Sequence, residues 1–193
     1  MQITKRLLIG LVLYCQSASA QTSADTALAS GNALLFADQL VKANFYQDWQ
    51  AYASLTCPSA IKYYGGKDGF RDHIVSIYYR DEPTVAEKPE TLKMVTLLND
   101  MDRWQCVVQK IRDTYINNRK AKIYTYLVGQ SLDNGATWKF IDVNHNDIRN
   151  VIYIMPDIFN TMPIPDRKTA FDDEVLAQEN KSSKKKTKRK KQR

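Results

Sequence analysis

The sequence predicts an α+β fold in which N-terminal helices pack on one face of an antiparallel sheet. Apolar residues recur at three- and four-residue spacing in the first half of the chain, as in amphipathic helices. Strand-like runs rich in β-branched and aromatic residues, separated by turn signals, fill the second half. About 150 residues lie between the two unusual ends of the chain, which is enough for one domain with its own core.

The first twenty residues have the pattern of a secretory signal peptide. A basic start at Lys5 and Arg6 precedes the apolar run LLIGLVLY and the small-residue sequence SASA. We expect cleavage after Ala20 and export to a periplasm or the medium, followed by a short linker over residues 21–30. No later stretch reaches the roughly 18 to 20 apolar residues that span a bilayer, so we expect no transmembrane segment.

Three helices are expected before the sheet. The stripe of the first, over residues 32–56, consists of Leu34, Val41, Phe45, Trp49, Tyr52 and Leu55. Pro58 ends this helix, and the short helical piece SAIKYY runs into Gly65 and Gly66, where two glycines stop a helix. The third helix is predicted from residue 68 to 79, with Phe70, Ile74 and Ile77 on one face.

Four strands are predicted at residues 91–98, 103–111, 120–132 and 137–143. Alternation predicts that Tyr124, Tyr126 and Val128 share one face of the sheet. Ile123, Thr125 and Leu127 share the other. We expect helices over one face, and a partner subunit or the segment 150–165 over the other.

A single roll domain with a C-terminal extension is therefore expected over residues 31–166. Residues 167–180 are predicted to be a short acidic helix or linker. Its first turn would hold Asp172, Asp173 and Glu174, because carboxylates suit a helix N-terminus.

The stretch SLDNGATW, residues 131–138, matches the Ser-x-Asp-x-Gly-x-Thr-Trp pattern of the Asp-box found in sialidases. The motif occurs once, in a domain too short for a propeller, so it does not indicate sialidase activity. It lies between two strand patterns and predicts a hairpin turn. Asn134 and Gly135 would supply the positive-φ positions, Asp133 would hydrogen-bond to the turn backbone, and Trp138 would pack beside it.

Helices followed by a sheet whose last hairpin reads YLVGQSLDNGATWKFIDV resemble the nuclear transport factor 2-like superfamily, the cystatin-like α+β roll. The stretch YYGGKDGFRDHI is similar to secreted bacterial members. The resemblance covers roughly residues 30–143. It implies a curved sheet that forms a cone-shaped roll, often with a ligand cavity inside. Enzymes of this superfamily place an Asp, His or Tyr in that cavity by geometry rather than by a linear motif.

The charge of +7 is concentrated at the C-terminus. The first twenty residues hold two of the 28 basic residues and the last thirteen hold nine, so residues 21–180 carry 17 basic against 21 acidic residues, a net charge of −4. We expect residues 181–193 to be a disordered polybasic tail. Its predicted polyanion-binding residues are Lys184, Lys185, Lys186, Lys188, Arg189, Lys190, Lys191 and Arg193.

Such a tail attracts an anionic envelope polymer or lipid surface through the release of counterions. The alternative is a solubilising tail, or one that contacts the acidic body of the same chain. The tail has no aromatic residues on which bases could stack, so the sequence argues against specific reading of nucleic acid.

Several residues are candidates for chemistry. His145, close to Asp142 and Asp147, can act as an acid or base with Asp142, or can be an ordinary loop histidine. We expect His73 to be structural. The aromatic residues that can line a ligand pocket, or else belong to the core or a dimer surface, are Tyr124, Tyr126, Trp104 and Trp138.

Removal of the signal leaves two cysteines, Cys57 and Cys106. They can form a disulfide in an oxidising compartment or remain two buried thiols. The sequence contains no recognisable zinc motif, phosphate-binding loop or nucleophile elbow, so no metal and no cofactor are expected.

The sequence leads us to expect a secreted or periplasmic binding protein without catalytic activity, with a homodimer as an option. One alternative is a cofactor-independent lyase or isomerase acting on a small hydrophobic substrate. Another is a secreted effector that uses the basic tail for localisation or for contact with nucleic acid.

Overall fold

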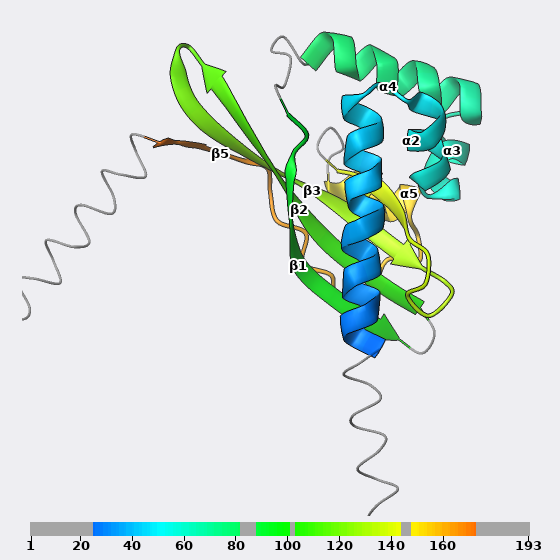
Figure 1. Ribbon diagram of the computed structural model, residues 1–193. Helices are drawn as coiled ribbons and strands as arrows, with labels where there is room; N and C mark the ends of the chain where they lie inside the picture. Colours follow the sequence, from blue (N-terminus) through cyan, green and yellow to red (C-terminus); the bar gives the residue numbers. More distant parts are fainter. Residues whose placement is uncertain (1–24, 82–87, 101–102, 144–147, 173–193) are drawn as a thin grey trace, which may run out of the picture.

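The computed structural model describes residues 25–81, 88–100, 103–143 and 148–172. Helices come first, and a curled antiparallel sheet follows them (Figure 1). This arrangement confirms the predicted fold class, an α+β fold with N-terminal helices packed on a curved antiparallel sheet. No helix in these four ranges is long and apolar enough to cross a membrane.

The first helix is described over residues 25–45 and lies against the sheet on a row of small side chains. Its buried residues are Ala29, Ala33, Ala37, Leu40, Val41 and Ala43. Because alanine side chains are short, the helix backbone can approach the sheet closely. The predicted linker over residues 21–30 is therefore wrong from residue 25 onward, since Ala29 already belongs to the core.

The predicted continuous helix over residues 32–56 is also wrong, because the chain turns at residues 46–48. Gln47 has a positive φ of 58°, and the Asp48 carboxylate accepts a hydrogen bond from the Ala51 N–H at 2.9 Å. Asp48 thereby caps a new helix, α2 (Trp49–Leu55). Sequence periodicity alone runs through this break, because apolar spacing continues on both sides of it.

The two later helices agree with the prediction. Helix α3 (Pro58–Tyr63) has Pro58 in its first turn, and α4 (Lys67–Asp81) begins after Gly65 and Gly66. These glycines have φ values of 85° and 96°, a region in which a side chain would be strained.

The four predicted strands are present as β1 (Thr91–Asp100), β2 (Arg103–Ile116), β3 (Arg119–Ser131) and β4 (Lys139–Asp142). They follow the order β1-β2-β3-β4 and pair antiparallel. Asn117 and Asn118, with φ values of 50° and 60°, form the turn between β2 and β3. Two successive residues of positive φ are typical of a primed hairpin turn, whose twist matches that of the strands.

Two elements near the C-terminus were not predicted: α5 (Ile148–Ile154) and β5 (Lys168–Phe171). Strand β5 pairs with residues 121–124 of β3, whereas β4 pairs with residues 127–130. The two short strands therefore lie end to end along one edge of β3. The expected acidic helix or linker over residues 167–180 is wrong at 168–171, because pairing with β3, rather than a pattern in four residues, makes this segment a strand.

A core lies on the helix side of the sheet. Register places Cys106, Val108 and Leu127 on this side, where they pack with the first helix, α2 and α4. Trp138 and Phe140 are completely buried in the same cluster. Gly129 is needed here, since a Cβ atom at this position would lie 2.7 Å from Cys106 Sγ and 2.4 Å from a ring carbon of Phe140.

A second core lies on the opposite side of the same sheet, which we call the α5 side. Val107, Tyr126 and Val128 pack there against Val151 and other apolar residues of α5 and the segment that follows it. The C-terminal segment thus covers the inner part of the second face, around Val107, Tyr126 and Val128, and is one of the two options expected from the sequence.

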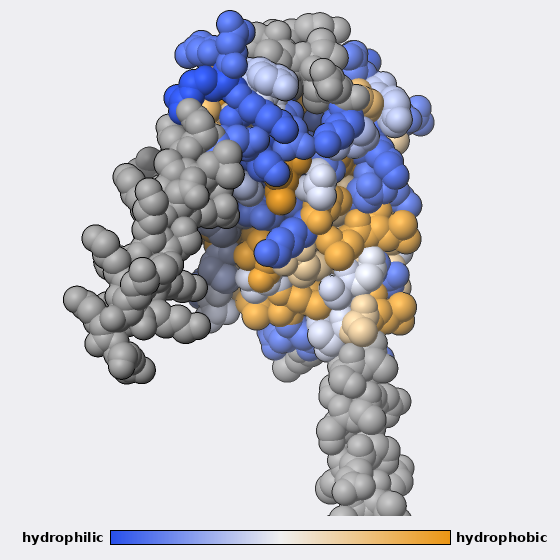
Figure 2. Space-filling view, turned by 60° about the vertical axis from the view of Figure 1, so that its left-hand side comes forward, coloured by the Kyte–Doolittle hydropathy of each residue, from blue (hydrophilic) through white to orange (hydrophobic). Residues whose placement is uncertain are grey.

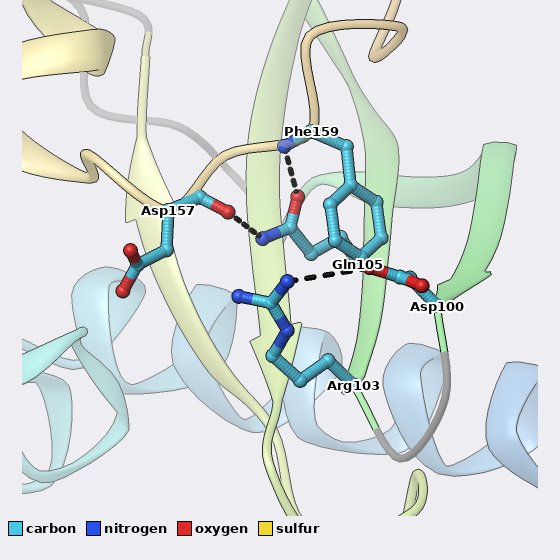
Figure 3. A network of polar contacts seen from close by, with 5 residues as sticks. All are labelled: Asp100, Arg103, Gln105, Asp157 and Phe159. Atoms are coloured by element: carbon cyan, nitrogen blue, oxygen red, sulfur yellow. Dashed lines mark hydrogen bonds and ion pairs between the residues drawn. The ribbon is translucent and has the colours of Figure 1, made fainter.

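Gln105 fixes that segment to the sheet (Figure 3). Its side chain is completely buried and lies between two backbone groups. The Gln105 carboxamide donates to the Asp157 carbonyl at 2.8 Å and accepts from the Phe159 N–H at 2.8 Å. The Arg103 guanidinium lies over the Phe159 ring, 5.5 Å from its centre, and pairs with Asp100 at 3.3 Å.

The Asp-box is a structural turn, as predicted. Asn134 and Gly135 have φ values of 57° and 81°. The Asp133 carboxylate accepts from the Thr137 N–H at 2.9 Å and from the Thr137 hydroxyl at 2.6 Å. Trp138 donates its indole N–H to the Gly135 carbonyl at 3.2 Å.

The turn also docks on the first helix. Asn32 donates to the Gly135 carbonyl at 2.9 Å, and a Cβ atom on Gly135 would lie 2.5 Å from the Ala29 Cβ atom. In this chain the motif therefore joins a hairpin to a helix.

Candidate functional site: a buried lysine centre and a basic hairpin arm

One buried polar cluster stands out on the helix side of the sheet. Lys110 of β2 lies between Asp142 at the end of β4 and Glu90 just before β1. Its Nζ atom lies 2.6 Å from Asp142 Oδ2 and 3.2 Å from Glu90 Oε2, and its side chain is 4% exposed. We call Glu90, Lys110, Thr125 and Asp142 the lysine centre.

Electrostatics keep Lys110 charged. Burial disfavours the ammonium form, but the Asp142 and Glu90 carboxylates outweigh this effect and raise the pKa of Lys110 above its ordinary value. A lysine that acts as a nucleophile must be deprotonated, which requires a lowered pKa. The geometry therefore favours Lys110 as a fixed donor of hydrogen bonds and positive charge.

Thr125 completes the lysine centre. It lies directly opposite Lys110 in the β2–β3 register and is 1% exposed. Its hydroxyl has no hydrogen-bond partner among the described residues. Buried hydroxyls are nearly always paired, so this group marks a position where a polar atom from outside the chain would be stabilised.

The buried Tyr52 lies close enough to Asp142 and Glu90 to be affected by their charges. Burial, followed by the charges of Asp142 and Glu90, raises the pKa of Tyr52 well above its ordinary value. Tyr52 stacks on Phe70 at 6.1 Å between ring centres, and Tyr64 stacks on His73 at 3.9 Å. His73 thus makes a packing contact, as expected for a structural histidine.

The candidate acid or base residues are only partly described. Asp142 belongs to the lysine centre, where it pairs with Lys110. His145 lies outside the described residues, so its proposed pairing with Asp142 stays a prediction. Within the described ranges, no three His, Cys, Asp or Glu side chains form a group that could hold a metal ion.

The structure separates the four predicted pocket aromatics. Trp104 and Trp138 are buried in the helix-side core, whereas Tyr126 belongs to the core on the α5 side. Tyr124 also lies on the α5 side, because it is two residues from Tyr126 on β3 and residues two apart in a strand share a face. The four side chains therefore cannot line one pocket, because alternate strand residues point to opposite faces.

Cys57 and Cys106 are free buried thiols, which matches the second of the two expected alternatives. Burial raises the pKa of Cys57 to about 12 and raises that of Cys106 as well. Both are poor nucleophiles in this state, because thiolate is the reactive form.

The second candidate site is the outer half of the β2–β3 hairpin. Residues 111–124 of this hairpin extend away from the helices, and β5 runs beside them (Figure 1). We call residues 111–124 together with β5 the arm. Figure 2 shows that hydrophilic surface predominates in the upper part of the molecule, at the height of the arm, and that apolar surface gathers lower down.

Basic side chains outnumber acidic ones on the arm. Residues 111–124 and 168–171 contain five basic residues and one acidic residue. The five basic residues are Arg112, Arg119, Lys120, Lys122 and Lys168. The acidic one, Asp113, pairs with Lys88 at 3.0 Å and with Lys122 at 3.8 Å. Hydrogen bonding to Lys88 lowers the pKa of Asp113, although partial burial opposes this shift.

The arm also determines where the C-terminal tail is attached. Strand β5 ends at Phe171, which pairs with Ala121 near the tip of the hairpin. The tail residues 181–193 lie outside the described residues. Covalent geometry nevertheless limits the nine residues from Asp172 to Lys181 to a span of about 30 Å. The polybasic sequence therefore begins within that distance of the basic arm.

Sequence reasoning missed the lysine centre, although the sequence contains a signal for it. Trp104, Cys106, Val108 and Lys110 occupy alternate positions of one strand, so Lys110 continues an apolar face. A charged residue on such a face needs a buried partner. Glu90 and Asp142 become recognisable as those partners only when the sheet order is known.

Comparison with protein-family models, with curated proteins and with solved structures gives no significant match for this chain.

Proposed function

We propose that the protein is an exported binding protein that attaches to an anionic polymer or surface through its polybasic tail and its arm. The observation that carries this proposal is the pairing of β5 with the outer half of β3. That pairing holds Phe171, ten residues before the tail, beside the hairpin and its exposed basic side chains. Two basic segments in one region attract a polyanion more strongly than either alone, because more counterions are released.

The charge of the remaining chain supports this division of labour. Residues 21–180 carry four more acidic than basic residues, yet residues 111–124 and 168–171 of the arm carry four more basic than acidic residues. A polyanion is therefore directed to the arm and repelled elsewhere. We also propose that the chain is a member of the nuclear transport factor 2-like superfamily, on the resemblance of its sequence over residues 30–143.

The test is salt-dependent retention on an immobilised anionic polysaccharide. Three proteins are compared: the full chain, a chain without residues 181–193, and a chain whose eight predicted binding residues of the tail are glutamine. We expect both variants to elute at clearly lower salt than the full chain and with the same circular dichroism spectrum. Retention that is unchanged in both variants would refute the role of the tail.

A small-ligand site at the lysine centre is a second candidate function, favoured by the buried, unpaired hydroxyl of Thr125. A neutral oxygen atom of a ligand would accept from Lys110 and pair with Thr125. Native mass spectrometry of the purified protein tests this function. A copurified small molecule that is lost on Thr125→Val supports it, whereas a wild-type protein that carries none counts against it.

A further inference from the structure

One face of the arm combines an exposed tyrosine, Tyr115, and a half-buried one, Tyr124, with lysine side chains. Between β2 and β3, Tyr115 pairs with Lys120 and Asp113 pairs with Lys122. Between β3 and β5, Tyr124 pairs with Lys168. Residues paired across antiparallel strands share a face, and so do alternate residues of one strand. We call Tyr115, Lys120, Lys122, Tyr124 and Lys168 the arm face.

The arm face is accessible to a large partner. Tyr115 is 62% exposed, and the Lys120 and Lys122 side chains are 56% and 45% exposed. Lys120 and Lys122 lie 3.8 Å from Asp172 and Asp113, at the long limit for an ion pair. Exposed pairs of this length are weak, so anions of a ligand can replace them.

The two faces of the arm differ in the kind of cation they carry. Arg112 and Arg119 belong to the opposite face, where Arg119 lies 4.0 Å from the centre of the Phe171 ring. The cations of the arm face are lysines, which act as point charges and lack the planar fork that suits phosphate groups. The arm face therefore fits spaced single anions better than a continuous phosphate backbone.

The tyrosine rings indicate that a ligand of the arm face carries flat groups as well as negative charge. Tyr115 lies on the outermost described row of this face and Tyr124 lies two rows further in, which corresponds to about 13 Å along the strands. Each ring offers a flat apolar surface with a polar hydroxyl at its edge. A ligand that matches this pattern alternates anionic groups with flat rings.

We propose that the arm face binds an acidic polysaccharide, with its sugar rings packed on Tyr115 and Tyr124. The carboxylate or sulfate groups of the polymer then contact Lys120, Lys122 and Lys168. This inference rests on the proposed function and adds the class of polymer to it. The expected export of the chain places it among such polymers rather than with nucleic acid.

The experiment compares three polyanions: heparin, inorganic polyphosphate, which has no rings, and single-stranded DNA. Binding to the full chain is measured at one fixed salt concentration. Tyr115→Ala removes one of the two rings on which the sugar rings pack. It should therefore weaken heparin binding about tenfold and leave polyphosphate binding unchanged. Tyr115→Phe keeps the ring and should retain most of the heparin affinity.

Tyr153 provides the matched control, because it is a 77% exposed tyrosine on α5, away from the arm face. Tyr153→Ala should leave all three affinities unchanged. Equal loss of heparin and polyphosphate binding in Tyr115→Ala would overturn the ring contact. Loss confined to single-stranded DNA would overturn the polysaccharide and indicate nucleic acid instead.

The failure of this inference can be distinguished from the failure of the proposed function. If removal of the tail weakens binding of every polyanion while Tyr115→Ala changes none, the proposed function stands and the polysaccharide site is refuted. If the full chain binds none of the three polymers, both are refuted.

Discussion

The two halves of the β2–β3 hairpin share one unbroken register but have opposite environments. The inner half, near Val107 and Val128, is covered by helices on one side and by the α5 segment on the other. The outer half carries exposed side chains such as Tyr115 and Lys120. Strand pairing is thus continuous, while burial ends partway along the strands. The comparison indicates that the inner half provides stability and that the outer half is available for binding.

The largest expected effect comes from removing the buried cation of the inner half. Lys110→Met leaves the carboxylates of Asp142 and Glu90 without their partner in a largely buried site. We expect a loss of about 3–5 kcal/mol in the free energy of unfolding, measured by urea denaturation.

Lys122→Met is the matched control in the outer half, because this lysine is on the same hairpin but exposed. Its cost should lie within about 0.5 kcal/mol of zero. Equal destabilisation by the two substitutions would remove the distinction between the two halves.

A smaller effect is expected where the α5 segment is fixed to the sheet. Gln105→Leu replaces the carboxamide by an apolar side chain of similar size. It leaves the Asp157 carbonyl and the Phe159 N–H without their partner. The expected cost is about 1–3 kcal/mol. Hydrogen exchange should show faster exchange of the Phe159 amide in the variant.

Arg103→Ala serves as the control for this substitution, because Arg103 contacts the same segment through an exposed side chain. It should cost about 1 kcal/mol or less. A Gln105→Leu protein as stable as wild type would show that the carboxamide does not hold the segment.

The smallest expected effect is the pH dependence of the Asp-box. Although partial burial opposes it, hydrogen bonds from Thr137 and Ser131 hold the pKa of Asp133 below its ordinary value of 3.8. A group with a lowered pKa in the folded state contributes stability above its unfolded pKa and loses it as the pH falls through its folded pKa.

The stability advantage of wild type over Asp133→Asn should therefore be fully present at pH 6 and decrease progressively as the pH falls below about 4. Urea denaturation at a series of pH values measures it. A difference that grows on acidification would contradict the assignment.

The sequence predicted the parts of the fold that depend on local pattern. The four strands, α3, α4 and the Asp-box turn follow from apolar periodicity and turn residues within short windows. The break before α2 was missed because it depends on the conformation of Gln47 and on the cap at Asp48, neither of which interrupts the apolar spacing. Strand β5 was missed because it exists through pairing with β3.

The candidate sites were less predictable, because they join residues that are distant in the chain. Predicted alternation on β3 correctly placed Tyr124 and Tyr126 on one face. Their grouping with Trp104 and Trp138 failed because the register between strands cannot be read from one strand. Asp142 was selected for its nearness to His145 in sequence, whereas in the structure its partner is Lys110, 32 residues away.

Hydrogen exchange of the full chain with and without heparin tests most directly whether the outer half binds while the inner half supports it. We expect amides of residues 113–122 to gain protection when heparin is added. Amides of residues 105–109 should exchange most slowly in both conditions and remain unchanged. Protection gained only in the inner half, or no change in the arm while heparin is bound, would contradict this account.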